Sequence, residues 1–333
     1  MATPSIPPKL THLFEKVFGG LPTDCVAVSP AASPRRYFRL SNETYTAIGT
    51  LHEDVLENKT FTTFARHFRS LNLSVPEVFA VDEEGKAYLQ EDLGDASLLD
   101  VWQGRAGHSK AEAISFYAMS LEALARIQVL GIDGLNRQAV IGRPTFDRRA
   151  MYWDLCYFKY NYLKLVHAPF DEQKLEEDFD TLLDLLATAR TDFFMHRDFQ
   201  ARNIMVTAHG PVIIDFQGGK PGPLAYDVAT LLYHARAGLS EEVREELLIH
   251  YQEAIQEVLG EVPDNFVKEY EGFALLRALQ VLGAYGYRGI FEGKELFKAN
   301  IPKALLQVQA LIEGPLHFLP LPELRRIFTY LIA

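Results

Sequence analysis

The stretch that decides the fold spans residues 194–217 and reads FMHRDFQARNIMVTAHGPVIIDFQ. It begins with a polar loop, 196–203, and continues with two short apolar runs, 204–206 and 212–214, that are separated by a turn. The second run ends at Asp215. Two short β-rich runs joined by a turn that contains glycine predict a β-hairpin. We therefore expect a polar loop before the first strand of this hairpin and a carboxylate directly after the second.

Three side chains of this stretch match the needs of phosphoryl transfer. Transfer of a γ-phosphoryl group requires an oriented acceptor hydroxyl and a metal-bound triphosphate, with little covalent chemistry by the protein. We assign Asp198 as the catalytic base and Asn203 and Asp215 as ligands of Mg²⁺, which prefers oxygen ligands and keeps waters and phosphates in its shell. The spacing H-R-D-x-x-x-x-N is that of protein kinases, and Asp-Phe-Gln follows where they have Asp-Phe-Gly.

Each of these residues taken alone is typical of an ordinary turn or strand end, but their order around one hairpin favours a reactive site. The segments HRDFQARN, IDFQGG and GPLAYDVATLL resemble the aminoglycoside phosphotransferase and choline kinase-like superfamily, over about residues 30–290. Within it they resemble the bacterial branch of cell-wall amino-sugar kinases, which phosphorylate N-acetylmuramate or N-acetylglucosamine at the anomeric hydroxyl. The resemblance implies ATP and Mg²⁺ as cofactors and a small-molecule hydroxyl as the acceptor.

The resemblance also implies an α+β, protein-kinase-like fold with two lobes. Residues 1–92 are expected to form a small ATP-binding lobe with a five-stranded antiparallel sheet that ends at a hinge. Residues 93–333 are expected to form a mostly helical lobe with the catalytic loop and the substrate site. Ser109 and Glu112 form a capping box, and apolar residues recur at helical spacing after it, which predicts a buried helix. With 333 residues, 48% of them hydrophobic, the chain can build one large or two closely packed domains.

Composition excludes several classes of function. The net charge is −11 and no basic run is longer than a pair, which argues against a nucleic-acid or anionic-membrane surface. Cys25 and Cys156 have neither the number nor the spacing of a disulfide framework or a metal site, so a reducing compartment is expected. The N-terminus lacks a signal-peptide pattern, and no window of 18 uncharged apolar residues occurs. We expect a cytoplasmic monomer.

The loop between the first two expected strands is the candidate lid over the ATP phosphates. It reads SPAASPRR and lacks the glycines of the protein-kinase loop. Hydroxyl, backbone and guanidinium donors can bind phosphate in their place. The candidates are Ser33, Arg35, Arg36 and Arg39, and the alternative is a basic surface hairpin.

The expected third strand, 44–51, carries no lysine, although kinases place a phosphate-binding lysine there. The counter-charge of the phosphates is therefore left to Arg36, Arg39 or Lys59. Glu57, in the expected helix 53–68, occupies the place of the glutamate that pairs with the kinase lysine. We leave two alternatives for Glu57, an ion pair with a loop arginine or a solvated helix position.

Two further segments are assigned from the resemblance. Backbone groups of Glu91 and Leu93 at the hinge are expected to bond the adenine edge. The segment 146–163 holds seven aromatic residues beside Asp154, and aromatic faces with nearby carboxylates suit a pyranose ring. Asp154 is the candidate for contact with the acceptor sugar. The alternative is that the aromatic residues pack between helices and that Asp154 is solvated.

Gln217 and Arg202 are further candidates for contact with the substrate. The segment 217–223 is expected to be a flexible loop, too short for a protein-kinase activation segment, which favours a small acceptor. Asp227 is expected to cap a helix, 228–237. The resemblance implies that it also braces the catalytic loop.

The expected apolar helix 273–287 has Arg277 as a polar exception, and Arg288 follows directly after it. Either arginine could meet a sugar or a carboxylate, and we expect instead that each pairs with a surface glutamate near a helix end.

Two other functions stay open at this point. One is an aminoglycoside or other small-alcohol phosphotransferase. An aminoglycoside phosphotransferase, in contrast to a kinase of a neutral or acidic sugar, would need many carboxylates in the segment 147–164 and the C-terminal helices to bind a polycation, and few occur there. A nucleotide-binding pseudokinase would explain the missing lysine but not the presence of Asp198, Asn203 and Asp215 together.

Overall fold

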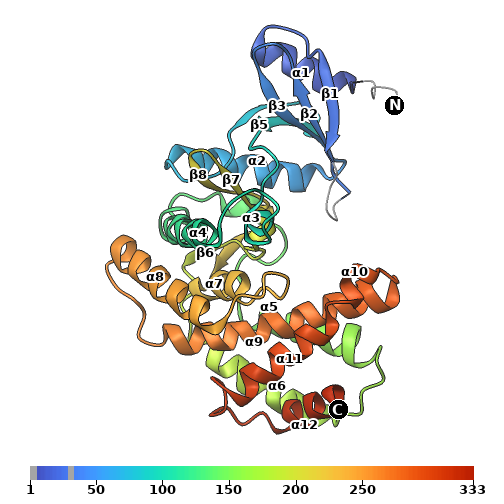
Figure 1. Cartoon of the computed structure of the whole chain (residues 1–333), viewed down its shortest axis with the longest axis vertical. Coiled ribbons are helices and arrows are strands. Elements are labelled where there is room, and N and C mark those ends of the chain that lie inside the picture. Colours follow the sequence, from blue (N-terminus) through green and yellow to red (C-terminus); the bar gives the residue numbers. More distant parts are fainter. Residues whose placement is uncertain (1–5, 29–33) are drawn as a thin grey trace. The chain divides into compact units, whose positions relative to one another are not determined.

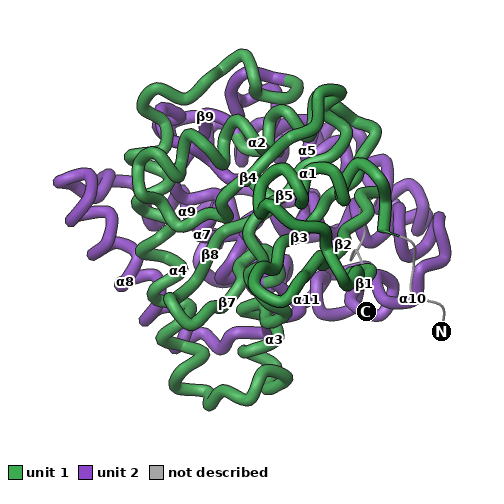
Figure 2. Tube along the Cα trace, turned by 90° about the horizontal axis from the view of Figure 1, so that it is seen from above, with its two compact units in different colours: residues 1–142, 202–219 green, residues 143–201, 220–333 purple. Residues whose placement is uncertain are grey.

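The structure is a computed structural model and describes residues 6–28 and 34–333. The chain divides into two compact units, which Figure 2 distinguishes by colour. Unit 1 consists of residues 1–142 and 202–219, and unit 2 consists of residues 143–201 and 220–333. The predicted lobe boundary at residue 92 falls within unit 1, directly after its main sheet, and stays a prediction.

Unit 1 contains the predicted five-stranded antiparallel sheet, in the order β1-β2-β3-β5-β4 (Figure 1). Together with the mostly helical remainder, it confirms the predicted fold class. The strands are β1 (Asp24–Val28), β2 (Arg36–Ser41), β3 (Thr46–Leu51), β4 (Val78–Val81) and β5 (Ala87–Glu91).

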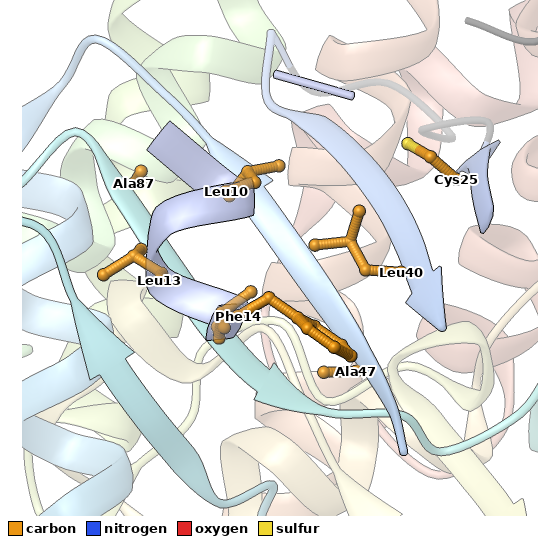
Figure 3. Packing of buried hydrophobic residues seen from close by; sticks show 8 residues of the cluster. Leu10, Leu13, Phe14, Cys25, Leu40, Ala47 and Ala87 are labelled. Carbon is orange, nitrogen blue, oxygen red and sulfur yellow. The ribbon is translucent and has the colours of Figure 1, made fainter. Parts of the chain in front are cut away.

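One face of this sheet is covered by α1 (Pro8–Phe18). Figure 3 shows its apolar side chains against small and branched residues of the strands, among them Leu40, Ala47 and Ala87. A Cβ added at Gly49 would lie 2.8 Å from Leu10, so only glycine allows helix and strand this close an approach. Each fully buried Leu or Phe side chain contributes about 1.5–3 kcal/mol, so α1 fixes the sheet firmly.

The opposite face is covered by α2 (Val55–Ser70), whose N-terminus is capped by Asp54. Successive strand residues point to opposite faces, so Tyr88 faces away from Ala87 and Leu89. Its ring stacks on Phe61 of α2 with centroids 5.3 Å apart. Tyr37, Thr50 and Tyr88 are cross-strand partners and form one row on this face.

The remainder of unit 1 holds the predicted hairpin, whose two strands pair antiparallel. Its further elements are α3 (Leu98–Trp102), α4 (Lys110–Leu130), η1 (Arg137–Ala139), β7 (Ile204–Thr207), β8 (Gly210–Ile213) and η4 (Phe216–Gly218). Among the residues that the structure describes, α4 is the one helix long and apolar enough to cross a membrane. Its side chains Tyr117, Leu121 and Leu124 are fully buried in the protein, as is typical of a core helix.

Unit 2 is mostly helical and is built around α9 (Phe266–Tyr285), which packs against α5, α6, α7 and α11. Its other elements are α5 (Arg148–Phe158), η2 (Lys159–Leu163), α6 (Glu172–Leu186), β6 (Phe193–Met195), β9 (Lys220–Gly222), α7 (Leu224–Leu232), α8 (Glu241–Leu259), η5 (Gly286–Phe291), α10 (Glu295–Lys298), α11 (Ile301–Glu313) and α12 (Pro322–Ile332). The short helix η3 (Ala201–Asn203) lies where the chain passes from unit 2 to unit 1.

The expectation of a flexible loop over 217–223 is wrong. Phe216–Gly218 is a 3-10 turn, and β9 pairs antiparallel with β6, with Met195 opposite Lys220. Glycine and proline are depleted in strands, which is why the sequence pattern of β9 did not indicate one. The apolar strand β6 supplies the backbone partners that order this segment.

The carboxyl group of Asp178 joins α6 to the start of α12. It is 2% exposed, and its Oδ2 accepts a hydrogen bond of 2.7 Å from the N–H of Leu324. Burial raises its pKa to about 6, although the N–H donors of Leu324 and Glu323 act in the opposite direction. Because this pKa lies above the unfolded value of about 3.9, the stabilising contribution of the protonated form is complete below pH ~4 and is lost as pH rises through about 6.

We therefore expect Asp178→Asn to stabilise the protein at pH 8, because the amide keeps an acceptor for Leu324 without a buried charge. The expected gain in the free energy of unfolding is about 1–2 kcal/mol at pH 8 and near zero at pH 4. Thermal unfolding at both pH values measures it, with Glu177→Gln on the exposed side of α6 as the control. Equal destabilisation at both pH values would contradict the assignment.

Candidate active site

The predicted metal ligands of unit 1 lie side by side at one end of the β7–β8 hairpin. Asn203 directly precedes β7, and Asp215 follows β8 with one residue, Ile214, between them. The Nδ2 of Asn203 donates to Oδ2 of Asp215 over 3.1 Å, and the N–H of Ile214 donates to the carbonyl of Asn203 over 3.0 Å. The predicted proximity of these two side chains is present in the structure.

Asp215 has a left-handed backbone, with φ 67° and ψ 32°. Aspartate tolerates this region better than most residues, but it occurs mainly where the surroundings hold it. Here the next residue is the anchor, because the Phe216 ring stacks on Phe61 at 5.0 Å and contacts Phe68 at 5.4 Å. The carboxylate is thereby fixed relative to α2.

Arg35 is a buried cation beside two carboxylates of unit 1. It lies directly before β2, is 3% exposed, and its Nη2 is 2.7 Å from Oε1 of Glu57. Its Nη1 is 3.9 Å from Oδ1 of Asp215. Of the two alternatives for Glu57, the ion pair with a loop arginine is confirmed. Arg35 is the arginine that the structure brings to both carboxylates. Which cation takes the place of the missing lysine, Arg35 or one of Arg36, Arg39 and Lys59, stays a prediction.

The side chain of Gln217 is buried and links Asp215 to Glu57. Its Nε2 donates to Oδ1 of Asp215 over 2.8 Å and to Oε1 of Glu57 over 3.3 Å. With only 9% of the residue exposed, contact with a substrate hydroxyl would require it to leave both carboxylates. The prediction of a substrate contact has no support in this arrangement.

The side chains fit a Mg²⁺ ion that takes the rest of its ligands from phosphate and water. No group of three or more His, Cys, Asp or Glu within 6–28 and 34–333 could hold a metal by protein ligands alone. One carboxylate and one amide, with Asp215 36% exposed at its side chain, match the incomplete shell that Mg²⁺ has at nucleotide sites. Asn203 and Asp215 are the residues that would hold it.

The other predicted nucleotide ligands are less uniform. Ser33 lies outside the described residues. Arg36 is exposed, whereas Arg39 donates to Asp92 over 2.7 Å and to Asp95 over 2.9 Å. The phosphate role of Arg36 and Arg39 stays a prediction, and Arg39 already has two carboxylate partners.

At the expected hinge, the N–H of Glu91 donates to the carbonyl of Glu77 over 2.9 Å. The N–H of Leu93 has no hydrogen-bond partner in the described part of the chain. A bound base could therefore use the Leu93 amide without breaking a bond. The adenine contacts of both residues stay predictions.

In unit 2, Asp227 holds the start of the catalytic loop. It is fully buried, and its two oxygens accept the N–H groups of His196 over 2.7 Å and Arg197 over 2.9 Å. The predicted bracing role is thus present. The predicted N-cap role is wrong, because α7 begins at Leu224 with Pro223 before it, which places Asp227 inside the first turn.

The side chain of Asp198 is 33% exposed and has Arg277 as an ion-pair partner. The Nη2 of Arg277 donates to Oδ1 of Asp198 over 2.9 Å, and Nε2 of Gln200 donates to the same oxygen. The expectation that Arg277 pairs with a surface glutamate is wrong, and the alternative of contact with a carboxylate is confirmed. The available signal was an arginine inside an otherwise apolar helix, because a buried cation requires a nearby anion.

Asp154 is a buried partner of the catalytic loop. Its Oδ1 accepts Nη2 of Arg197 over 2.9 Å, its side chain is 8% exposed, and its Oδ2 is buried as well. Arg197 has a left-handed backbone, with φ 74°, and its guanidinium lies 4.9 Å from the ring centre of Phe146. Asp154 thus fixes the residue before Asp198, and its substrate contact stays a prediction without geometric support.

The aromatic segment divides between core and surface. Phe146, Phe158 and Tyr162 are buried, as the packing alternative predicted, whereas Trp153 and Tyr160 are about half exposed. In the catalytic loop, Arg202 is half-buried within η3, and its substrate contact stays a prediction.

In unit 1, the carboxylate of Asp215 and the amide of Asn203 lie next to the buried pair of Arg35 and Glu57. The chain also carries Asp198 in a loop that Asp227 holds in place. Together these features define a phosphotransferase of the kinase type. The family model described as "Phosphotransferase enzyme family" matches residues 24–261, and the chain belongs to this family.

Curated relatives extend the similarity over most of the chain. An N-acetylmuramate/N-acetylglucosamine kinase of Neisseria meningitidis serogroup B is 26% identical over 309 residues, which cover 89% of this chain and 88% of the relative. The kinase of the same description from Pseudomonas aeruginosa is 25% identical over 289 residues, with 85% and 82% covered.

Solved structures agree on the fold. A choline kinase from Cryptosporidium parvum superposes with a TM-score of 0.64 at 12% identity, covering 96% of this chain and 99% of that chain. A thermostable mutant of the aminoglycoside phosphotransferase APH(4)-Ia, in a ternary complex with AMP-PNP and hygromycin B, has a TM-score of 0.56 at 15% identity, covering 92% of this chain and 98% of that chain.

Proposed function

We propose that the protein is an ATP- and Mg²⁺-dependent kinase that phosphorylates the anomeric hydroxyl of an N-acetylated amino sugar. The observation that carries the proposal is the set Arg35, Glu57, Asn203 and Asp215 in unit 1, which has the charges and oxygen ligands for a metal-bound triphosphate. The sugar class is taken from three relatives of 25–26% identity that are described as N-acetylmuramate/N-acetylglucosamine kinases.

In the proposed reaction, Asp198 accepts the proton of the acceptor hydroxyl while that oxygen attacks the γ-phosphorus. The bond between the γ-phosphorus and the β–γ bridging oxygen breaks, and ADP leaves. Arg35 holds phosphate oxygens, and Glu57 and Gln217 keep Arg35 and Asp215 in place. When bound, Mg²⁺ neutralises part of the triphosphate charge.

The alternative of a polycationic aminoglycoside acceptor has less support. The carboxylates near the aromatic segment already have arginine partners, Asp147 with Arg143 and Asp154 with Arg197. A polycation would require carboxylates that are available to it. The pseudokinase alternative rested on the missing strand lysine, and in this proposal Arg35 supplies that cation. Cytoplasmic location, the monomeric state and the lobe boundary at residue 92 remain part of the proposal.

A parallel acceptor assay tests the substrate class. ADP release is measured with N-acetylmuramate, N-acetylglucosamine, glucose, kanamycin and choline, each with MgATP. We expect turnover with the two N-acetylated sugars that exceeds turnover with the other acceptors by at least about tenfold in kcat/KM. Turnover confined to kanamycin or choline would refute the sugar assignment while leaving the kinase assignment intact.

A further inference from the structure

Arg277 is an unusual residue for the middle of a core helix. On α9 its neighbours Leu275, Leu276 and Leu279 are fully buried, and its own side chain is 12% exposed. A cation in this position is costly unless it is paired. Its guanidinium is bound at both ends, because Nη1 donates to Oε1 of Gln280 over 2.6 Å and Nη2 donates to Asp198 over 2.9 Å.

The charges around Asp198 occur in pairs. Arg277 meets Asp198, and Arg197 meets Asp154, each over 2.9 Å. The buried ring of Tyr226 has both guanidinium groups 6.0 Å from its centre. Three other charged or titratable groups lie near these pairs. Asp227 binds backbone N–H groups, and the Nδ1 of His196 accepts the N–H of Asp198. The third group is Lys220, whose pKa is lowered by burial.

Gln200 and Arg277 both donate to Oδ1 of Asp198. Two donors on one oxygen fix the rotation of the carboxylate as well as its position. A base must lie within hydrogen-bond reach of the proton that it accepts, and a displacement of about 1 Å can cost about 10²-fold in rate.

We propose that Arg277 is the positioning residue of the catalytic base and that, by compensating its charge, it disfavours cationic acceptors. The proposal rests on the assignment of Asp198 as the base in the proposed function. An uncompensated carboxylate beside the acceptor would attract an ammonium group, and its pairing with Arg277 removes that attraction. The enzyme thereby accepts neutral and acidic sugars at a site whose reacting residue is itself an anion.

The test compares Arg277→Gln and Arg277→Lys with wild type on three sugars that differ in charge: glucosamine, N-acetylglucosamine and N-acetylmuramate. Arg148→Gln is the matched control, because Arg148 pairs with two exposed aspartates, Asp180 and Asp184, in the same unit. For Arg277→Gln we expect a loss of about 10²-fold in kcat with N-acetylglucosamine and a much smaller change in its KM. The ratio of kcat/KM for glucosamine to that for N-acetylglucosamine is expected to rise about tenfold.

Arg277→Lys keeps the charge but loses the second donor. It should therefore lower kcat without changing the ratio of kcat/KM for glucosamine to that for N-acetylglucosamine. Gln280→Leu keeps Arg277 and removes the acceptor of its Nη1, so it should lower kcat less than Arg277→Lys does. This variant replaces Arg277→Gln in the test if Arg277→Gln does not fold. The proposal would be overturned if Arg277→Gln matched Arg148→Gln both in kcat and in the ratio of kcat/KM for glucosamine to that for N-acetylglucosamine.

The result also separates this proposal from the proposed function. If wild type phosphorylates none of the three sugars, the sugar assignment fails, and the same variants are compared on choline and its neutral isostere 3,3-dimethylbutanol. If only water accepts the phosphoryl group, kcat for ATP hydrolysis is compared instead. An unchanged kcat for Arg277→Gln in that assay overturns the positioning role.

Discussion

Asp198→Asn is expected to lower kcat by about 10³-fold with little change in the affinity for MgATP. The amide has the shape of the carboxylate and keeps an oxygen for Arg277 and Gln200, but it cannot accept the proton of the acceptor hydroxyl. Because nucleotide ligands and base are different residues, a thermal shift on addition of MgATP should persist in the variant. Steady-state rates with N-acetylglucosamine and the thermal shift are the two measurements.

The matched control is Asp264→Asn, an exposed aspartate in the loop before α9, which should retain wild-type rates. Asp198→Asn removes the negative partner of Arg277, so a modest fall in Tm is expected as well. Turnover within about tenfold of wild type in a folded Asp198→Asn protein would show that another group accepts the proton.

Arg35→Met is expected to lower kcat/KM for ATP by about 10²–10³-fold, the usual size for loss of one preorganised charged donor. The reason is the position of Arg35, between Glu57 at 2.7 Å and Asp215 at 3.9 Å, where a triphosphate on a metal at Asp215 would require a cation. Arg35→Lys keeps the charge without the planar fork and should lose less. The measurement is the dependence of the initial rate on ATP concentration.

Arg66→Met is the control for this prediction, since Arg66 lies exposed on α2 of the same unit. Arg35 is buried, so its replacement also leaves Glu57 without its partner and lowers stability. Arg35→Lys and unfolding curves for all variants separate that effect from nucleotide binding. Wild-type kcat/KM for ATP in Arg35→Met would return the phosphate role to Arg36, Arg39 or Lys59.

The backbone of the site could be predicted because its signals are local. The hairpin, the loop before it and the carboxylate after it follow from a continuous stretch of 24 residues, whereas the five-stranded sheet was implied by the family resemblance. The position of Asn203 beside Asp215 is a consequence of pairing β7 with β8, since the two residues flank the paired strands.

The partners of the charged side chains could not be predicted, because they depend on packing between distant segments. Arg277 and Asp198 are 79 positions apart, and Gln217 reaches Glu57 across 160 positions. For Asp154, composition indicated a solvated or substrate-facing carboxylate, and only the packing of α5 shows that it is buried against Arg197. Arg35 was one of several loop arginines until the sheet showed which one lies on the face covered by α2.

The position of the phosphate in the product tests the central claim most directly. Wild-type protein is incubated with MgATP and N-acetylglucosamine or N-acetylmuramate, and the product is examined by proton-coupled ³¹P NMR. The account predicts a phosphate coupled to the anomeric proton and its absence with Asp198→Asn. A phosphate on any other hydroxyl, or no sugar phosphate from an enzyme that phosphorylates choline or kanamycin, would contradict it.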